Sequence, residues 1–152
     1  MIFEQLFDEK SSTYTYIIAS GEGREALIID PVIEHSDEYS TVLRNLDLKL
    51  VKVIDTHIHA DHISAMNELN KRTNCIRVMG EKSKSEVIDM KIKDSEKIKI
   101  EEIELQAIYT PGHTDCSYSF LMSDRVFTGD TLLINGTGRT DFQNGNSADA
   151  YD

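Results

Sequence analysis

The feature that most constrains this chain is a run of histidines that directly follows a buried strand. Leu48–Thr56 carries a nearly continuous apolar stretch, which predicts a strand covered on both faces. The chain then continues Thr56-His57-Ile58-His59-Ala60-Asp61-His62, with three imidazoles and a carboxylate within six residues. Zinc and iron favour these two ligand types, and a loop at a strand end can bring several of them together. The segment predicts a metal site, with a polar surface loop as the alternative.

The hydrophobic pattern predicts an α/β fold in a single domain, residues 1–152. Three N-terminal strands are expected as an antiparallel meander, and two amphipathic helices follow. Ser36 or Asp37 is the expected N-cap of the first helix. The expected strands are Met1–Phe7, Thr13–Ser20, Ala26–Asp30, Leu48–Thr56, Cys75–Met79, Ile98–Ile100, Ile103–Tyr109, Ser117–Met122 and Arg125–Phe127; the expected helices are Glu34–Leu46 and Ile63–Arg72, with a first helical turn over Ser147–Asp152 capped by Ser147; Glu81–Asp94 is ambiguous and Leu132–Asn146 is expected to be loop.

Charge and composition exclude several classes of partner. The 16 Lys and Arg against 27 Asp and Glu give a net charge of −11, which repels nucleic-acid backbones and anionic lipid. We therefore expect no nucleic-acid and no membrane partner. The N-terminus lacks the basic and apolar regions of a signal peptide, so we expect a cytoplasmic location. Cys75 and Cys116 form no CxxC pair and are expected to be free thiols.

Two further loops place a metal-binding side chain just after a predicted strand. In Tyr109-Thr110-Pro111-Gly112-His113 the Pro-Gly turn presents His113 at a strand end. In Phe127-Thr128-Gly129-Asp130 a carboxylate follows a short strand. Taken alone, such a histidine is more often a solvated surface residue, and such an aspartate is more often a turn former. With the histidine run, the two loops strengthen the prediction of a metal site.

Strand-end loops that carry His-x-His-x-Asp-His, then His, then Asp occur in this order in the metallo-β-lactamase superfamily, which the chain resembles. The resemblance covers nearly the whole chain and implies an αβ/βα sandwich with metal at the edge between its sheets. Residues 129–143, GDTLLINGTGRTDFQ, are most similar to the persulfide dioxygenase (sulfur dioxygenase) branch. Glyoxalase II is similar, but it usually diverges after Gly-x-Gly-Arg.

The resemblance to the dioxygenase branch implies one Fe(II) per chain, held by His57, His113 and Asp130. His59, Asp61 and His62 would then lie around the iron and orient its ligands and bound water. In the glyoxalase II alternative, one or two zinc ions are bound. There His57, His59 and His113 hold one metal, Asp61 and His62 hold the other, and Asp130 bridges them.

The implied activity is an iron-dependent dioxygenase that oxidises the small thiol substrate glutathione persulfide with O₂ and water to sulfite and glutathione. The alternatives are a two-metal hydrolase of glutathione thioesters and an inactive metal-binding fragment. Thr114 is expected either to contact substrate or to stabilise its own turn. Arg139 is expected either to pair with Asp141 or to bind an anionic substrate. His35 lies outside every motif and is expected at the surface.

Members of the resembling family continue beyond the position that matches Asp152, so we expect the C-terminal part of the sandwich to be missing from this chain. An uncovered sheet exposes apolar area, which monomeric proteins rarely tolerate beyond a few hundred Å². We therefore expect a homo-oligomer, and weak or no turnover of glutathione persulfide by these 152 residues.

Overall fold

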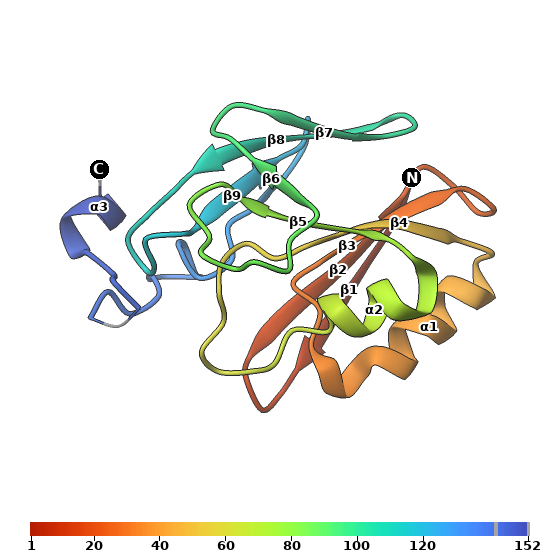
Figure 1. The fold of residues 1–152 in the computed structure, drawn as a ribbon, viewed down its shortest axis with the longest axis horizontal. Coiled ribbons are helices and arrows are strands. Elements are labelled where there is room, and N and C mark those ends of the chain that lie inside the picture. Colours follow the sequence, from red (N-terminus) through yellow and green to blue (C-terminus); the bar gives the residue numbers. More distant parts are fainter. Residues whose placement is uncertain (142, 152) are drawn as a thin grey trace. The chain divides into compact units, whose positions relative to one another are not determined.

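The computed structural model describes residues 1–141 and 143–151 and divides into two compact units (Figure 1). The first unit comprises residues 1–55, 59–78 and 99–103, and the second comprises residues 56–58, 79–98 and 104–152. Phe142, in the segment that resembles the dioxygenase branch, and Asp152, the end of the last predicted helix, lie outside the described residues. The prediction of a single domain over residues 1–152 stays a prediction.

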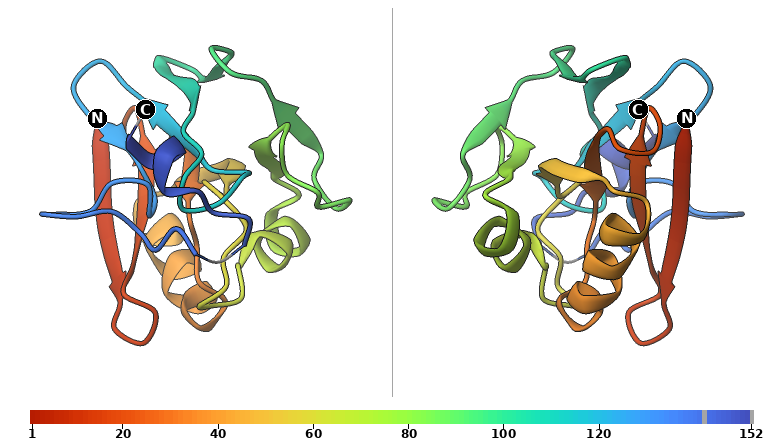
Figure 2. Two further views of the ribbon diagram at one scale, coloured as in Figure 1. Left: turned by 90° about the vertical axis from the view of Figure 1, so that its left-hand side faces the viewer. Right: turned by 90° about the vertical axis from the view of Figure 1, so that its right-hand side faces the viewer.

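The first unit contains a sheet of mixed direction. Strands β1 to β4 and the start of β5 lie side by side in chain order. The pairs β1/β2 and β2/β3 are antiparallel, as the predicted meander requires, whereas β3/β4 and β4/β5 are parallel. Figure 2 shows β1 and β2 as a long hairpin. The bounds are β1 Ile2–Asp8, β2 Thr13–Ala19, β3 Glu25–Ile29, β4 Lys49–Ile54 and β5 Ile76–Gly80.

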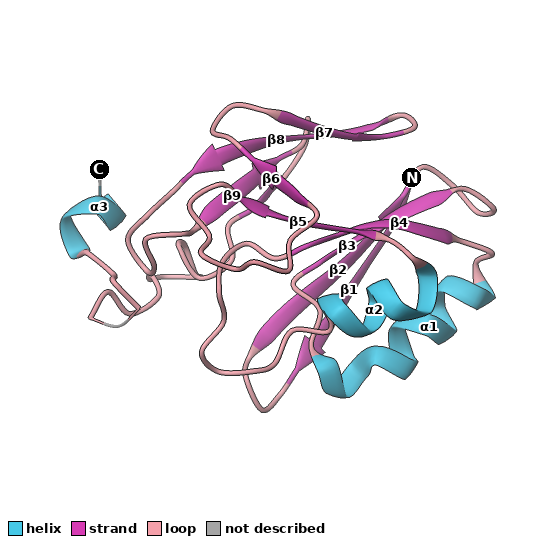
Figure 3. Cartoon of the chain, viewed as in Figure 1, coloured by secondary structure: helices cyan, strands magenta, loops and turns pink. Residues whose placement is uncertain are grey.

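Two helices make the connections between the parallel strands, and both present the predicted apolar face. Helix α1 (Ser36–Asn45) joins β3 to β4 and buries Tyr39 and Leu43, while α2 (Met66–Thr73) joins β4 to β5 and buries Leu69 (Figures 1 and 3). The Arg72 Nη1 of α2 donates to Asp37 Oδ1 of α1 at 2.8 Å, so the helices lie side by side. Among the described residues, no helix has the length and apolar character needed to cross a membrane.

The predicted start of each helix is wrong for a local reason. A 3-10 turn, Ile33–His35, precedes α1, and the Ser36 hydroxyl donates back to the Ile33 carbonyl at 2.7 Å instead of capping the helix. Helix α2 begins at Met66, three residues later than predicted, and the Ser64 Oγ accepts a hydrogen bond from the Met66 N–H at 3.1 Å. The hydrophobic period therefore located both helices, while side-chain hydrogen bonds decided where they begin.

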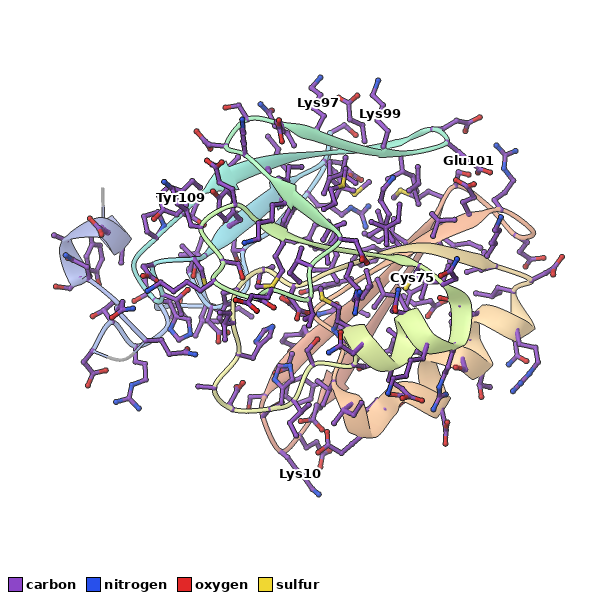
Figure 4. All side chains as sticks on the ribbon, in the orientation of Figure 1. Lys10, Cys75, Lys97, Lys99, Glu101 and Tyr109 are labelled. Atoms are coloured by element: carbon purple, nitrogen blue, oxygen red, sulfur yellow. The ribbon has the colours of Figure 1, made fainter. Side chains whose placement is uncertain are left out.

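The second unit holds most of an antiparallel four-stranded sheet in the order β10-β9-β8-β7. Its strands are β7 (Lys97–Ile100), β8 (Ile103–Tyr109), β9 (Tyr118–Leu121) and β10 (Val126–Phe127). In β7, Ile98 and Ile100 are buried while Lys97 and Lys99 are exposed, and Figure 4 shows both lysines pointing outward. This alternation is the period of a half-buried strand.

Two short elements complete the second unit. Strand β6 (Met90–Ile92) forms within the ambiguous charged segment. Helix α3 (Ser147–Tyr151) begins at the predicted residue, but Asn146 Oδ1 accepts the backbone hydrogen bonds of Ala148 and Asp149, so the predicted cap at Ser147 is wrong by one residue. The two cysteines of the chain are free, as predicted, and both are buried.

His35, which lies outside every motif and is expected at the surface, contacts two carboxylates. Its Nε2 lies 2.8 Å from Asp8 Oδ1, and its Nδ1 lies 2.9 Å from Glu38 Oε2. The hydrogen bond to Asp8 raises the pKa of His35 despite its partial burial. Hydrogen bonds from Ser11 and His35 lower the pKa of Asp8 to about 2. The imidazole thus links the β1–β2 hairpin to the start of α1.

We predict that Gly80→Ala destabilises the protein, because a Cβ at Gly80 would overlap the ring of the buried Tyr118. Overpacking of this kind costs about 1–3 kcal/mol. Gly136→Ala is the matched control, since nothing lies within 4 Å of its Cβ position. Urea denaturation of both variants gives the difference in unfolding free energy. Equal stability of the two variants would contradict the packing described.

We predict that His35→Gln lowers stability in a pH-dependent way. A histidine whose pKa is raised by folding stabilises fully below its unfolded pKa of about 6.5, and this contribution disappears as pH rises through the folded pKa. Asp8, with its lowered pKa, contributes until pH falls toward about 2. The loss should be below about 1 kcal/mol for a partly exposed pair. It should be larger at pH 5.5 than at pH 9 in urea denaturation, and an equal loss at both would refute the assignment.

Candidate metal centre

Three strand-end side chains meet within the second unit. His57 follows β4 along the chain, His113 follows the Pro-Gly turn after β8, and Asp130 follows β10. The Asp130 Oδ2 lies 3.6 Å from His57 Nε2 and 3.4 Å from His113 Nε2. One ligand atom from each residue falls within 4.8 Å of the others. The structure thus brings together the three residues that the resemblance assigns to iron.

The spacing of these atoms fits a transition metal. Two nitrogen or oxygen ligands, each about 2.0–2.2 Å from a metal and about 90–110° apart, lie about 3.0–3.6 Å from one another. The two measured distances to Asp130 Oδ2 fall within that range. Two imidazoles and one carboxylate form the donor set that non-haem Fe(II) sites use, and zinc also accepts it.

Hydrogen bonds on the far side of each imidazole orient it. The His113 Nδ1 donates to the Arg139 carbonyl at 2.8 Å, and because a carbonyl only accepts, this nitrogen carries the proton. This leaves Nε2, which faces Asp130 Oδ2 at 3.4 Å, as the nitrogen that can bind a metal. The Nδ1 of His57, which is buried, lies 2.9 Å from the Thr56 hydroxyl. Partners of this kind select the tautomer and the orientation of a metal-binding histidine.

Two glycines allow the backbone to approach these rings closely. Gly129 has a φ of 52°, and a Cβ there would overlap the Thr56 hydroxyl. A Cβ at Gly138 would lie 2.6 Å from His113 Nδ1 and would overlap the Asp130 carbonyl. The Gly138 N–H also donates to that carbonyl at 2.6 Å. The sequence shows these glycines, but only the structure shows which groups they accommodate.

A second cluster lies in the first unit. One ligand atom each from His59, Asp61 and His62 falls within 4.8 Å of the others. The His62 Nδ1 is 3.0 Å from Asp61 Oδ1 and 3.2 Å from the Thr13 hydroxyl. Its Nε2 is buried and has no hydrogen-bond partner among the described residues. Burial and the neighbouring His59 lower the pKa of His62, which favours a neutral ring.

His59 has a different partner, which the sequence reasoning missed. Its Nε2 lies 3.1 Å from Asp30 Oδ1, and both side chains are almost fully buried. Burial alone lowers the pKa of His59, but the Asp30 carboxylate outweighs it and raises the pKa to about 9. Burial also raises the pKa of the nearby Asp55 to about 7. Asp30 directly follows the buried strand β3, and this placement of a carboxylate just after a strand is the signal that would have identified it.

The two predicted substrate contacts are engaged within the protein. Thr114 is buried, and its hydroxyl lies 2.5 Å from that of Ser117. The Thr114 carbonyl accepts from the Gly112 N–H at 3.2 Å, so this residue stabilises its own turn. The Arg139 guanidinium pairs with Asp141 at 2.8 Å, as one of its two predicted roles requires.

Comparison with known proteins finds relatives that match almost the whole chain. The family description "Metallo-beta-lactamase superfamily" matches residues 9–89 and 80–152. The mitochondrial persulfide dioxygenase ETHE1 of Mus musculus is 38% identical over 99% of this chain. A hydroxyacylglutathione hydrolase of Dictyostelium discoideum is 30% identical over 83% of this chain and is matched over 50% of its own length. The chain spans about 60% of the length of the mouse relative.

The structural comparison gives the same fold. The crystal structure of ETHE1 from Myxococcus xanthus superimposes with a TM-score of 0.97 at 47% identity, covering 100% of this chain and 67% of that one. The predicted α/β fold of the metallo-β-lactamase type is confirmed, and the chain corresponds to only part of its relatives' length. The match over both halves of the chain and the high identity to these relatives lead to one conclusion: the chain belongs to the metallo-β-lactamase superfamily.

Proposed function

We propose that His57, His113 and Asp130 hold the single Fe(II) of a persulfide dioxygenase. The observation that carries the proposal is the convergence of both Nε2 atoms on Asp130 Oδ2, at 3.6 and 3.4 Å. The identity to proteins named persulfide dioxygenase, over almost the whole chain, supports the same activity. When bound, Fe(II) with two imidazoles and one carboxylate would keep open positions for O₂ and a sulfur ligand.

The proposed substrate is a thiol persulfide, with glutathione persulfide as the first to test. Glutathione persulfide, O₂ and water give glutathione and sulfite, and this equation balances in atoms and electrons. The Arg139 carbonyl accepts a hydrogen bond from His113 Nδ1 and keeps the proton on that nitrogen. The other nitrogen, Nε2, is then available to bind the metal. The hydrogen bond between Thr56 and His57 does the same for the other ring when Thr56 accepts.

The second candidate function is hydrolysis of a glutathione thioester at a two-metal site. It is favoured by the cluster of His59, Asp61 and His62 and by the similarity to a hydroxyacylglutathione hydrolase. A metal bound there would supply hydroxide by lowering the pKa of a bound water. The contact between His59 Nε2 and Asp30 leaves the Nδ1 of that ring as the nitrogen that a metal could use.

Two measurements test the proposal against this alternative. We expect the protein purified from its own host to contain iron, and to consume O₂ and form sulfite when glutathione persulfide is added. Hydrolysis of S-lactoylglutathione without oxygen uptake would overturn the dioxygenase in favour of the hydrolase. The expected homo-oligomer remains a proposal, which light scattering after size exclusion tests.

We predict that His113→Ala removes most of the bound metal, because it deletes one of three proposed ligands. Metal per chain, measured by elemental analysis after dialysis, should fall well below that of the parent protein. His35→Ala is the control and should retain the metal, since its partners are Asp8 and Glu38. If His113→Ala binds as much metal as the parent, the ligand assignment is wrong.

We predict one metal per chain, and therefore no loss of metal in His62→Ala. His62 belongs to the second cluster, so its removal should matter only if that cluster also binds an ion. Elemental analysis of the parent and the variant gives the two stoichiometries. A parent with two metals per chain that loses one in His62→Ala would favour the hydrolase.

A further inference from the structure

A pocket of about 170 Å³ lies in the second unit, where its walls adjoin two of the proposed ligands. Ile58, the neighbour of His57 in the chain, and Thr114, the neighbour of His113, both line it. The pocket is thus built on the two loops that carry the imidazoles. A molecule that occupies it lies against the same loops as a substrate at the metal.

The charged rim of this pocket is formed by Lys82 and Lys84. Both side chains are exposed, and neither has an ion pair among the described residues. Asp115 also lines the pocket, but its Oδ2 accepts a hydrogen bond from Asn144 at 3.2 Å. The pocket lining therefore carries two ammonium groups and one carboxylate, which leaves an excess of positive charge.

The position of Lys82 is supported by an aromatic ring. Its Nζ lies 6.0 Å from the centre of the Tyr109 ring, at the outer limit of a cation–π contact. The Tyr109 hydroxyl donates to the Asp115 carbonyl at 2.7 Å, and its ring lies 5.0 Å from that of Tyr118. Figure 4 labels Tyr109 at the end of β8. The ring that supports Lys82 is therefore itself held in place.

Lys82 and Lys84 are positively charged in a protein whose net charge is strongly negative. The chain carries a net charge of −11, so its overall field repels anions. An anion that binds near the metal loops must meet a local positive patch, and Lys82 and Lys84 supply one at the pocket rim. A neutral or cationic ligand would gain nothing from these two side chains.

We propose that this pocket binds the carboxylate end of a peptide thiol, with Lys82 and Lys84 as the residues that select an anionic substrate. The proposal rests on the proposed function, because it assigns the far end of the molecule whose sulfur reacts at the metal. A small inorganic persulfide, which has no carboxylate, would leave the pocket empty. A thiol that carries a carboxylate some bonds away from its sulfur can occupy both places.

Equilibrium binding tests the pocket without catalysis. S-methylglutathione and its dimethyl ester are titrated by calorimetry into the parent protein, the double variant Lys82→Gln/Lys84→Gln, and the control Lys10→Gln. Lys10 is an exposed lysine at the turn between β1 and β2 in the first unit, labelled in Figure 4, and its replacement makes the same kind of charge change. Inorganic phosphate is titrated as a third ligand, which measures simple anion binding.

We expect the parent and Lys10→Gln to prefer the acid over the ester, and the double variant to lose that preference, with on the order of tenfold weaker binding of the acid. Equal binding of the acid by the double variant and the parent would overturn the proposal. So would a parent that binds neither analogue, or one that binds phosphate as tightly as S-methylglutathione.

Oxygen uptake separates failure of the pocket from failure of the proposed function. With glutathione persulfide, the double variant should show a raised KM and an unchanged kcat, whereas with cysteamine persulfide, which has no carboxylate, its KM should match the parent's. An unchanged KM for glutathione persulfide overturns the pocket assignment alone. A parent that consumes no oxygen with either persulfide refutes the dioxygenase, while the calorimetric result still decides what the pocket binds.

Discussion

The candidate metal centre depends on one hydrogen bond from a side chain to the backbone. A histidine binds metal only through an unprotonated nitrogen, so the other ring nitrogen must keep the proton. The Arg139 carbonyl imposes this choice on His113, and Gly138 permits the approach because any Cβ would meet the same ring. The loop that contains Gly138 and Arg139 therefore acts on the chemistry through its backbone, while the Arg139 guanidinium pairs with Asp141.

Two clusters with similar residues differ in how their histidines are engaged. In the second unit, both Nε2 atoms face one carboxylate oxygen at distances suited to a shared metal. In the first unit, a buried carboxylate, Asp30, contacts His59 and raises its pKa to about 9. A metal ion at this ring would have to displace one of its two protons. The same residue types thus support metal binding in one cluster and an ion pair in part of the other.

Electrostatics also connects the proposed substrate with the chain's composition. An acidic protein that acts on an anionic thiol needs local positive charge, because its long-range field opposes the approach. The rim lysines of the pocket meet this need with groups that are not neutralised by partners among the described residues. Their side chains are exposed, so salt screens the attraction and limits it to a modest gain in affinity for anionic ligands.

The sequence by itself determined the fold class, the order of the elements and the three candidate ligands. Hydrophobic period located most of the helices and strands, the strand-end loops indicated a metal site, and the resemblance to the dioxygenase branch singled out His57, His113 and Asp130. The hydrophobic period does not determine where a helix begins, because side-chain hydrogen bonds to the backbone decide its first turn. The predicted N-caps Ser36 and Ser147 were therefore wrong.

Only the tertiary structure decided what each candidate contacts. It paired His59 with Asp30, which lies 29 positions away in the chain, and His113 with the carbonyl of Arg139, 26 positions away. It also placed Lys82 and Lys84 on the rim of a pocket lined by residues from the His57 and His113 loops. Contacts between distant segments depend on strand register and on how loops close, and a local residue pattern carries no information about either.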